Sequence, residues 1–376
     1  MKKNWIVISL VLVVALGIVL VVTQTKKEPG EIKIGAILIL TGPDAKAGQS
    51  AKKGVDLALY EINTEATGKN KLKIIFEDDQ GEPLKATSAL LKLINVDKVS
   101  AVIGPMWSTS VLAVAPIAEK NKVVILSPTA SAPKITNAGD YIFRNTYSDL
   151  FEGRKDAEYA YNELKYKSVG IIYVNIDAGI GIANVFSERF KELGGEIVLK
   201  EGYEQSTVDF KSLLAKFRSK QIDLIYLMGY SEMGQIVKQT REMGINLPIL
   251  STIMFEISDV IKIAGDAAEG TIYSYPSYDP ERGGEIIKKF AEEFKNKYGI
   301  WPDPEAAFSY DATKILYSVI LQTGSNSENI KDKLYTIKNY IGVTGKTSFD
   351  ENGDVIKSIG FKIVENGKYV WQTFQY

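Results

Sequence analysis

The sequence predicts an α/β protein made of two doubly wound lobes with a ligand cleft between them. From residue 32 onward, short runs rich in β-branched residues alternate with stretches of helical periodicity, which is typical of parallel strands covered by helices. The rhythm completes one unit, breaks at residues 143–146 and starts again. A chain of 376 residues is long enough for two such units, each with its own core.

The first unit is expected over residues 32–126. Its strands are predicted at 32–40, 71–77, 101–103 and 123–126. Helix 45–62 has Gly54, Ala58 and Ile62 four residues apart on one face, and another helix opens at Pro83. A third helix is expected from Ser108 or Thr109 to residue 121, because a hydroxyl side chain is a natural helix cap.

The second unit repeats this pattern and is followed by a tail of different character. Helices are expected at 149–164, 182–193, 210–218 and 232–243, and strands at 169–174, 196–201, 222–228 and 249–251. Two long amphipathic helices at 285–298 and 306–322 precede strands within 347–372, which surround the turns at Asn352-Gly353 and Asn366-Gly367. Since neither tail segment could fold alone, we expect both to return and complete the lobes.

The expected organisation is therefore an anchor and two interleaved lobes. Residues 1–30 form the anchor and linker, 31–145 with 275–346 the first lobe, and 146–274 with 347–376 the second. The chain would cross between the lobes at residues 143–146, 273–276 and 345–349.

The N-terminus predicts export. Lys2 and Lys3 precede an apolar run at residues 5–22, and about 18 apolar residues are just enough to cross a membrane as a helix. No small-residue cleavage site follows, and the chain has no Cys that could be lipid-modified. We therefore expect an uncleaved N-terminal hydrophobic helix with the body of the protein outside the cytoplasm, and a cleaved signal peptide as the alternative.

Composition excludes several mechanisms. The sequence contains no His and no Cys, which removes Ser-His-Asp triads, His-ligated zinc, thiol nucleophiles and disulfides. The net charge of −1, with Lys and Glu interspersed, argues against nucleic acid as a partner. No cofactor or metal is expected. A phosphate loop at residues 342–347 fails on its glycine spacing, because Tyr340 stands where the loop needs Gly.

Two segments lie where open α/β sheets bind ligands, at the carboxyl ends of first-lobe strands. In residues 103–110, Ser108 offers a hydroxyl and the free N–H groups of a helix start, which suit an anion, although it could be a helix cap alone. Trp107 beside it could line the site or serve packing. In residues 127–133, small residues allow the backbone to approach a ligand closely, although such residues also make ordinary turns.

At this point the chain resembles type I periplasmic binding proteins, of the branch that binds branched-chain amino acids for ABC transporters. The resemblance covers nearly everything after residue 31 and rests on the order and spacing of these segments: Ile34-Gly35, Thr41-Gly42-Pro43, residues 54–63, Asp78-Asp79, Ile103-Gly104-Pro105, Ser127-Pro128, Ala132-Pro133, Phe143-Arg144, residues 263–270, Gly345, Phe349-Asp350 and Gly353-Asp354. It implies two Rossmann-like lobes that close around one ligand.

The resemblance also assigns roles to individual residues. Ser108 matches the Ser whose hydroxyl binds the ligand α-carboxylate, and Ser131 would contribute its hydroxyl and N–H to the carboxylate and ammonium. The carbonyl of Thr129 would accept from the ammonium and Ala130 would line the wall. Tyr230 resembles the second-lobe Tyr that covers the ligand. Neutral donors at a helix start can hold a carboxylate without a buried cation.

Departures from the family pattern concern the size and charge of the pocket. Ala47 and Ala178 replace tyrosines that amino-acid binders usually carry, which implies a roomier pocket. The acidic residue that family members place near 251–254 to pair with the ammonium is missing, and Glu256 could substitute if the loop is shifted. Tyr147 adds aromatic surface near the mouth. An α-amino acid and a larger, aromatic carboxylate or amide both remain open.

The sequence thus predicts a non-enzymatic, monomeric receptor outside the cytoplasm that captures a small solute and delivers it to an ABC permease in the membrane. One rival is an enzyme using Asp78, Asp79 and Glu256 as carboxylates, although paired Asp after a strand is usually a solvated strand end. Another is a sensor or assembly module that has lost solute binding, since the usual ammonium partner is missing.

Overall fold

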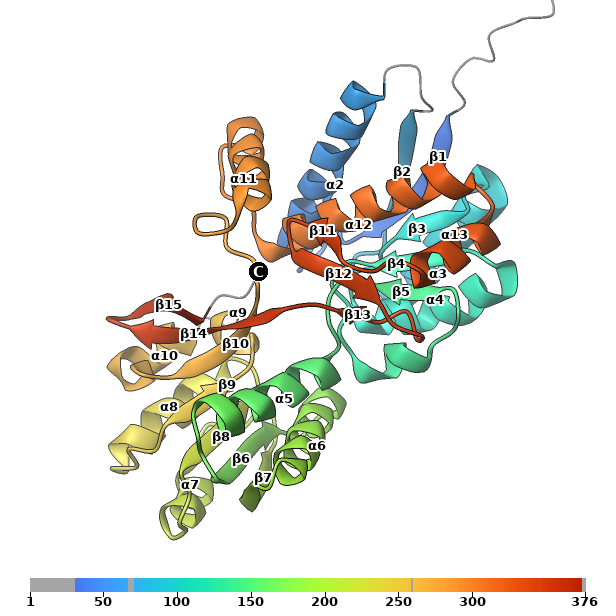
Figure 1. The fold of residues 1–376 in the computed structure, drawn as a ribbon. Coiled ribbons are helices and arrows are strands. Elements are labelled where there is room, and N and C mark those ends of the chain that lie inside the picture. The colour runs from blue at the N-terminus through green and yellow to red at the C-terminus, as the bar shows by residue number, and fades with distance from the viewer. Residues whose placement is uncertain (1–30, 67–70, 258–259, 374–376) are drawn as a thin grey trace, which may run out of the picture.

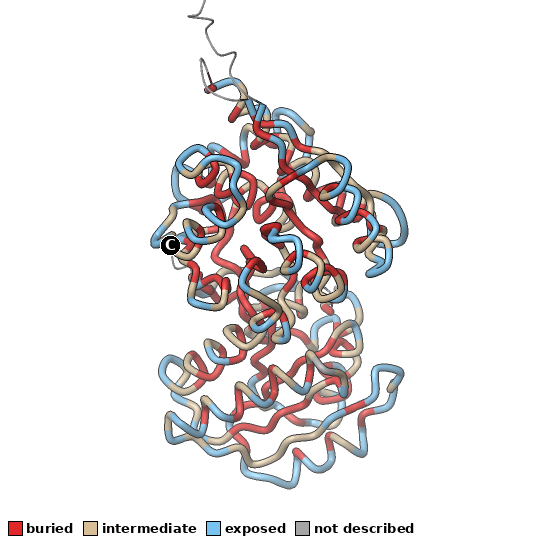
Figure 2. The backbone as a smooth tube through the Cα atoms, turned by 90° about the vertical axis from the view of Figure 1, so that its right-hand side faces the viewer, coloured by how far each residue is buried: buried red, intermediate tan, exposed pale blue. Residues whose placement is uncertain are grey.

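The computed structural model describes residues 31–66, 71–257 and 260–373, which form two lobes (Figure 1). In Figure 2 the two lobes lie one above the other, and buried backbone runs through the middle of each. Each lobe is built around its own sheet, and a small third sheet accompanies the first lobe. The predicted two-lobed α/β architecture is therefore confirmed.

The sheet of the first lobe is fully parallel and has the order β2-β1-β3-β4-β5. The bounds of its strands are β1 (Ile32–Leu38), β2 (Leu72–Asp78), β3 (Ala101–Ile103), β4 (Val124–Ser127) and β5 (Ile142–Arg144). The first four strands confirm the sequence prediction to within two residues at each end. The order places the ends of β3 and β4 next to each other, so the two candidate segments that follow them are neighbours.

Helices cover both faces of this sheet. One face packs against α2 (Ala45–Glu65) and α12 (Pro304–Thr323), with Ala36 and Leu38 of the sheet buried against Val55 and Ile315. The other face packs against α3 (Pro83–Lys92), η1 (Leu93–Asp97) and α4 (Ser108–Asn121). Gly54 allows α2 and α12 to approach closely, because a Cβ there would collide with the backbone of Ala306. The lobe therefore depends on a helix from late in the sequence.

The sheet of the second lobe has seven strands in the order β15-β14-β10-β9-β8-β6-β7. Five are parallel, namely β6 (Ser168–Val174), β7 (Glu196–Tyr203), β8 (Leu224–Met228), β9 (Ile249–Ser251) and β10 (Ile272–Pro276). The last two, β14 (Ile359–Glu365) and β15 (Lys368–Thr373), pair antiparallel beside β10. Asn366 and Gly367 both have positive φ, of 53° and 67°, which suits the two-residue turn predicted there.

Helices cover this second sheet as well. They are α5 (Asp149–Glu158), η3 (Tyr159–Glu163), α6 (Asp177–Glu192), α7 (Lys211–Arg218), α8 (Glu232–Glu242), α9 (Met254–Ile257), α10 (Val260–Ala264) and η4 (Gly265–Ala268). The helix expected at 149–164 is divided into α5 and a π-helical turn, η3. Helix α6 begins five residues before its predicted start, since residues 177–181 already take helical geometry. These shifts leave the order of elements unchanged.

The remaining elements lie between β10 and β14. Helix α11 (Glu285–Tyr298) was predicted, whereas α13 (Ser327–Tyr335) was not. Strands β11 (Tyr340–Gly342), β12 (Gly345–Phe349) and β13 (Val355–Ile356) form the third sheet, which lies beside α12 and α13 in Figure 1. The third passage between the lobes therefore lies between β13 and β14. The expected crossing at 345–349 instead coincides with β12, whose partners are β11 and β13.

The predicted N-terminal hydrophobic helix at residues 5–22 lies outside the described residues. Within the described part of the chain, no helix combines the length and the apolar character needed to span a membrane.

Candidate ligand-binding site

A cavity of about 450 Å³ lies between the lobes and is lined by residues of both. The first lobe contributes the starts of α4 and α12, the loop after β4 and the segment after β5. The second lobe contributes the starts of α5 and α6 and the loops after β8 and β9. Its volume lies within the range of about 300 to 1,000 Å³ that is usual for small-molecule sites.

Ser108, Thr129 and Ser131 lie together in this cavity, as the sequence predicted of neighbouring strand ends. Ser108 is the first residue of α4 and Trp107 takes the cap position, so the hydroxyl of Ser108 does not cap its own helix. It accepts a hydrogen bond from the N–H of Ala132 instead, at 3.1 Å. The interpretation of Ser108 as a helix cap is therefore wrong, and its hydroxyl joins the two candidate segments.

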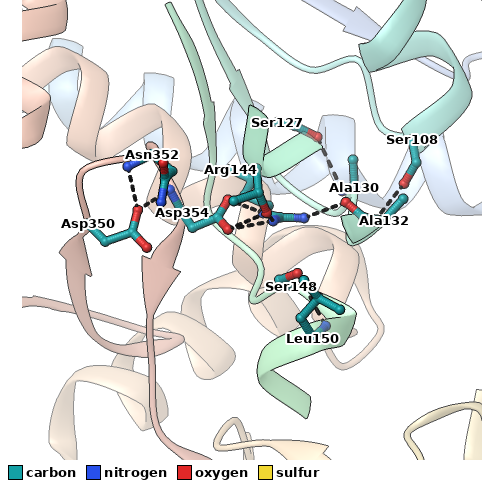
Figure 3. Close-up of polar contacts among 11 residues, drawn as sticks. Ser108, Ser127, Ala130, Ala132, Arg144, Ser148, Leu150, Asp350, Asn352 and Asp354 are labelled. Carbon is teal, nitrogen blue, oxygen red and sulfur yellow. Dashed lines mark hydrogen bonds and ion pairs between the residues drawn. The ribbon is translucent and has the colours of Figure 1, made fainter. Parts of the chain in front are cut away.

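The loop after β4 is held by side chains from its own lobe (Figure 3). Ser127 Oγ donates to the carbonyl of Pro105 at 2.6 Å and accepts from the N–H of Ala130 at 3.2 Å. Thr129 Oγ1 donates to the carbonyl of Met106 at 3.0 Å. Ala130 is itself 1% exposed and does not line the cavity, so its predicted place in the wall is not observed. These contacts fix the backbone on which Ser131 stands.

Arg144, at the end of β5, holds the far side of the same loop. Its Nη1 donates to the carbonyl of Ala132 at 2.9 Å, and its Nε and Nη2 donate to the two carboxylate oxygens of Asp354 at 2.6 and 2.7 Å. Figure 3 shows the guanidinium between Asp354 and Ala132. Arg144 is fully buried, and its planar fork satisfies both groups at once. It thereby connects the binding loop to the segment between β12 and β13.

Asp149 and Glu152 bring negative charge to the cavity from the first turn of α5. The N–H of Asp149 donates to the carbonyl of Ser131 at 2.9 Å, and burial raises the pKa of the Asp149 carboxyl to about 6, against the lowering effects of Ser131 and Arg144. Glu152 is 2% exposed and accepts from the N–H of Ile253 at 2.9 Å and from Ser274 Oγ at 2.7 Å. Burial raises its pKa as well.

Glu305, at the start of α12, adds a third carboxylate from the other lobe. Burial and the nearby charge of Asp303 raise its pKa to about 7, and Lys46 acts in the opposite direction. The sequence analysis missed Asp149, Glu152 and Glu305, because acidic residues in the first turn of a helix are ordinary and give no sign of burial. The sequence feature that could have identified them is their common position, since each lies at the start of a helix that follows a strand or loop at the cleft.

Tyr230, Trp107 and Ala178 line the cavity, as expected. Asp149 lies close enough to Tyr230 to help raise the pKa of its hydroxyl, after the larger effect of burial. Trp107 Nε1 lies 3.4 Å from Asp44 Oδ2, a contact that orients the indole. Met106, Tyr147, Ile182, Met228, Ile253 and Phe308 make most of the remaining wall apolar.

Glu256 lies outside this cavity, contrary to its expected role as a substitute ammonium partner. Its carboxylate accepts from Lys362 Nζ at 2.8 and 3.1 Å and from the hydroxyl of Tyr273 at 2.6 Å. It lines a second cavity of about 430 Å³ together with Tyr275 and Trp371. Helix α9 turns Glu256 toward β10 and β14, so its charge is already compensated within the fold.

Among the described residues, no group of acidic side chains has the arrangement of a metal site. Asp78, named above as an enzymatic candidate, accepts from Thr41 Oγ1 at 2.5 Å and from the N–H groups of Leu40 and Gln80. It therefore stabilises the turn after β1, and Asp79 is buried beside it. Neither residue lines the interlobe cavity.

The fold and the cavity are those of a two-lobed solute-binding protein, in which one small molecule lies between the lobes. Comparison with known proteins agrees: the model of the periplasmic binding protein family matches residues 31–367, and the chain belongs to this family. A Leu/Ile/Val-binding protein of Escherichia coli is 29% identical over 350 residues, which cover 91% of each chain.

Two solved structures have the same fold. The leucine binding protein of Thermotoga maritima is 32% identical with a TM-score of 0.75, and the match covers 91% of this chain and 98% of that one. A branched-chain amino acid transporter substrate binding protein of Streptococcus pneumoniae, solved in complex with isoleucine, is 32% identical with a TM-score of 0.74, over 90% and 97% of the two chains.

Proposed function

We propose that this protein is the solute-binding component of an ABC transporter and captures an α-amino acid, branched-chain or related, between its lobes. It acts outside the cytoplasm and delivers the ligand to a permease in the membrane. Its relatives are named for leucine, isoleucine and valine, and its cavity combines a largely apolar wall with a polar end. The protein works as a monomer without enzymatic chemistry and is held at the cell surface by its N-terminal segment.

The observation that carries the proposal is the opposite polarity of two neighbouring groups at one end of the cavity. Ser108 and Ser131, with the N–H groups at the start of α4, offer hydrogen-bond donors and the positive end of a helix to the ligand carboxylate. Asp149, joined to Ser131 through its backbone N–H, offers negative charge to the ligand ammonium. A zwitterion satisfies both groups at once.

The remaining site residues then have the following roles. The carbonyl of Thr129 accepts from the ammonium, and Tyr230 covers the ligand from the second lobe. Trp107 and Ala178 bound the space for the ligand side chain. Lobe closure brings Tyr230 and Ser108 onto the same molecule, which shifts the protein from an open to a closed ensemble.

An aromatic acid without an ammonium group fits the site less well. Three carboxylates line the cavity, whereas Lys and Arg are absent among its described lining residues. An anionic ligand would add negative charge to a wall that already carries three carboxyl groups and no basic side chain among its described residues, and a buried charge without a counter-charge is costly. Loss of solute binding is disfavoured as well, since the cavity has a polar end and a volume of about 450 Å³.

The test is to measure amino-acid binding by calorimetry and thermal shift in the wild-type protein and in Ser108→Ala and Ser131→Ala. Each substitution removes a donor to a charged carboxylate, which typically weakens binding by about 1.5 to 3 kcal/mol, or more than tenfold. Thr109→Ala is the matched control, because Thr109 is exposed on the same helical turn and does not line the cavity. Unchanged affinity in both Ser variants would refute the proposed carboxylate site.

A further inference from the structure

We propose that the preferred ligand is a basic amino acid, whose side chain ends in a second cationic group bound by Glu305. This inference rests on the proposed function, because it takes the α-carboxylate to lie at Ser108 and Ser131 and the α-ammonium to lie at Asp149. It adds the chemistry of the other end of the ligand.

Glu305 faces the cavity from the lobe opposite to Asp149 and Glu152. It is in the first turn of α12, whereas the other two acids are in the first turn of α5. Asp303 and Lys46 act on the pKa of Glu305, whereas Arg144 acts on that of Asp149. The cavity therefore receives acidic side chains from both lobes.

The fold has no evident use for the Glu305 carboxylate. Asp303 caps α12, since its Oδ1 accepts from the N–H of Ala306 at 3.0 Å and from Ser50 Oγ at 2.5 Å. Among the described side chains, none forms a hydrogen bond or an ion pair with Glu305. The N–H of Glu305 itself and the charge of Lys46 offset part of the cost of burying this carboxylate, but its pKa remains raised. A largely buried carboxylate without an ion-pair partner is destabilising unless something else supplies the counter-charge.

Other polar groups of the cavity also lack partners. Tyr147 and Thr252 line the cavity and are 4% and 1% exposed, and their hydroxyls form no hydrogen bond with any described residue. Buried hydroxyls are normally paired, so two unpaired hydroxyls on residues of the wall favour a polar ligand over an apolar one. This observation is independent of the charges on the wall.

Charge balance favours a cationic group at the end of the ligand side chain. The α-ammonium of a neutral amino acid would compensate the charge of Asp149 and leave Glu305 unpaired. A basic amino acid brings a second positive charge, and the apolar wall with Trp107 and Phe308 suits the methylene chain between its two ends. Ala178 leaves room for a long side chain where a larger residue would not.

Norleucine and lysine form the matched pair of probes, because lysine is norleucine with a terminal ammonium. We expect the wild-type protein to bind lysine at least tenfold more tightly than norleucine, as a site built to pair a polar group rejects the analogue that lacks it. Glu305→Leu should reverse this preference, and Glu305→Gln should reduce it. Glu285→Leu is the control, since Glu285 is likewise in the first turn of a helix, α11, but is exposed and does not line the cavity.

The outcomes separate the two proposals. Norleucine binding as tightly as lysine, glutamine binding more tightly than lysine, or an unchanged lysine-to-norleucine ratio in Glu305→Leu and Glu305→Gln would each overturn the basic-ligand inference while leaving the amino-acid site intact. Failure of all amino acids to bind the wild-type protein would instead overturn the proposed function. The near-isosteric Glu305→Gln keeps the test valid if Glu305→Leu does not fold.

Discussion

The interlobe cavity and the second cavity, which is lined by Glu256, are similar in volume and both contain acidic and aromatic side chains, but their carboxylates have opposite surroundings. Glu256 is held by Lys362 and Tyr273, so the fold itself compensates its charge. Asp149 and Glu305 line a wall without basic side chains among its described residues. The comparison indicates that a carboxylate with an ion-pair partner serves stability here, whereas Asp149 and Glu305, whose pKa values remain raised, are available to a cationic ligand.

The largest effect is expected at Asp354, whose carboxylate pairs with the buried guanidinium of Arg144. Arg144→Met removes a fully buried partner with three short contacts and leaves Asp354 uncompensated, so the free energy of unfolding should fall by about 3 to 5 kcal/mol. Urea denaturation measures this loss. Arg144→Lys, which keeps the charge without the fork, should recover part of it. A loss below about 1 kcal/mol in Arg144→Met would contradict the stabilising role given to the Arg144–Asp354 pair.

Asp149→Asn should lower ligand affinity without lowering stability, the opposite of the effect expected for Arg144→Met. Loss of the charge that faces the ligand ammonium should weaken amino-acid binding by about 1.5 to 3 kcal/mol, while the ligand-free protein stays as stable as the wild type or becomes more stable. Calorimetric titration and thermal melting of the same sample measure both quantities. Reduced stability with unchanged affinity would show that Asp149, like Glu256, stabilises the fold and does not bind the ligand.

Glu256→Gln tests whether the carboxylate of the second cavity serves stability alone. The substitution weakens the contacts with Lys362 and Tyr273, so the free energy of unfolding should fall by about 1 to 2 kcal/mol and the affinity for amino acids should not change. Denaturation and calorimetry are again measured together. A loss of affinity greater than tenfold would return Glu256 to the binding site.

The smallest expected effect is in the pH dependence of stability. The raised pKa values of Asp149, about 6, and Glu305, about 7, mean that these groups bind more protons in the folded than in the unfolded state. Their contribution to stability is full below the unfolded pKa values and is lost as the pH rises through 6 and 7. The ligand-free protein should therefore become less stable from pH 5 to pH 8.

Glu305→Gln isolates one of these groups. At pH 8 the variant should be more stable than the wild type by about 1 kcal/mol, and at pH 5 the difference should shrink. Melting temperatures across this range provide the measurement. An identical pH dependence in the two proteins would mean that Glu305 is not destabilised by burial.

The sequence predicted the fold more completely than the site, for physical reasons. Hydrophobic periodicity is local, so most strand and helix positions, including α4 and α11, followed from it. The place of the Glu256 side chain depends on how α9 packs against β10, and the burial of Glu305 depends on how α12 packs against α2. Such tertiary relations leave no periodic trace, which is why one acid was wrongly expected in the cleft and another was missed.

The hydroxyl residues were predicted more successfully. Ser108 and Ser131 follow adjacent parallel strands, and adjacency at a sheet edge can be inferred from the βα rhythm alone. The crossing expected at 345–349 could not be located equally well, because short antiparallel strands such as β12 and β13 carry too few residues to indicate which sheet they join.

The late return of the chain has a consequence for biosynthesis. Helix α12 completes the first lobe and β14 and β15 complete the second, so both cores need segments from the last quarter of the sequence. During translocation across a membrane, neither lobe can reach its final packing until these segments emerge. A chain that stops after β13 would keep α12 against α2 but expose the edge of β10, and an exposed strand edge is a template for aggregation.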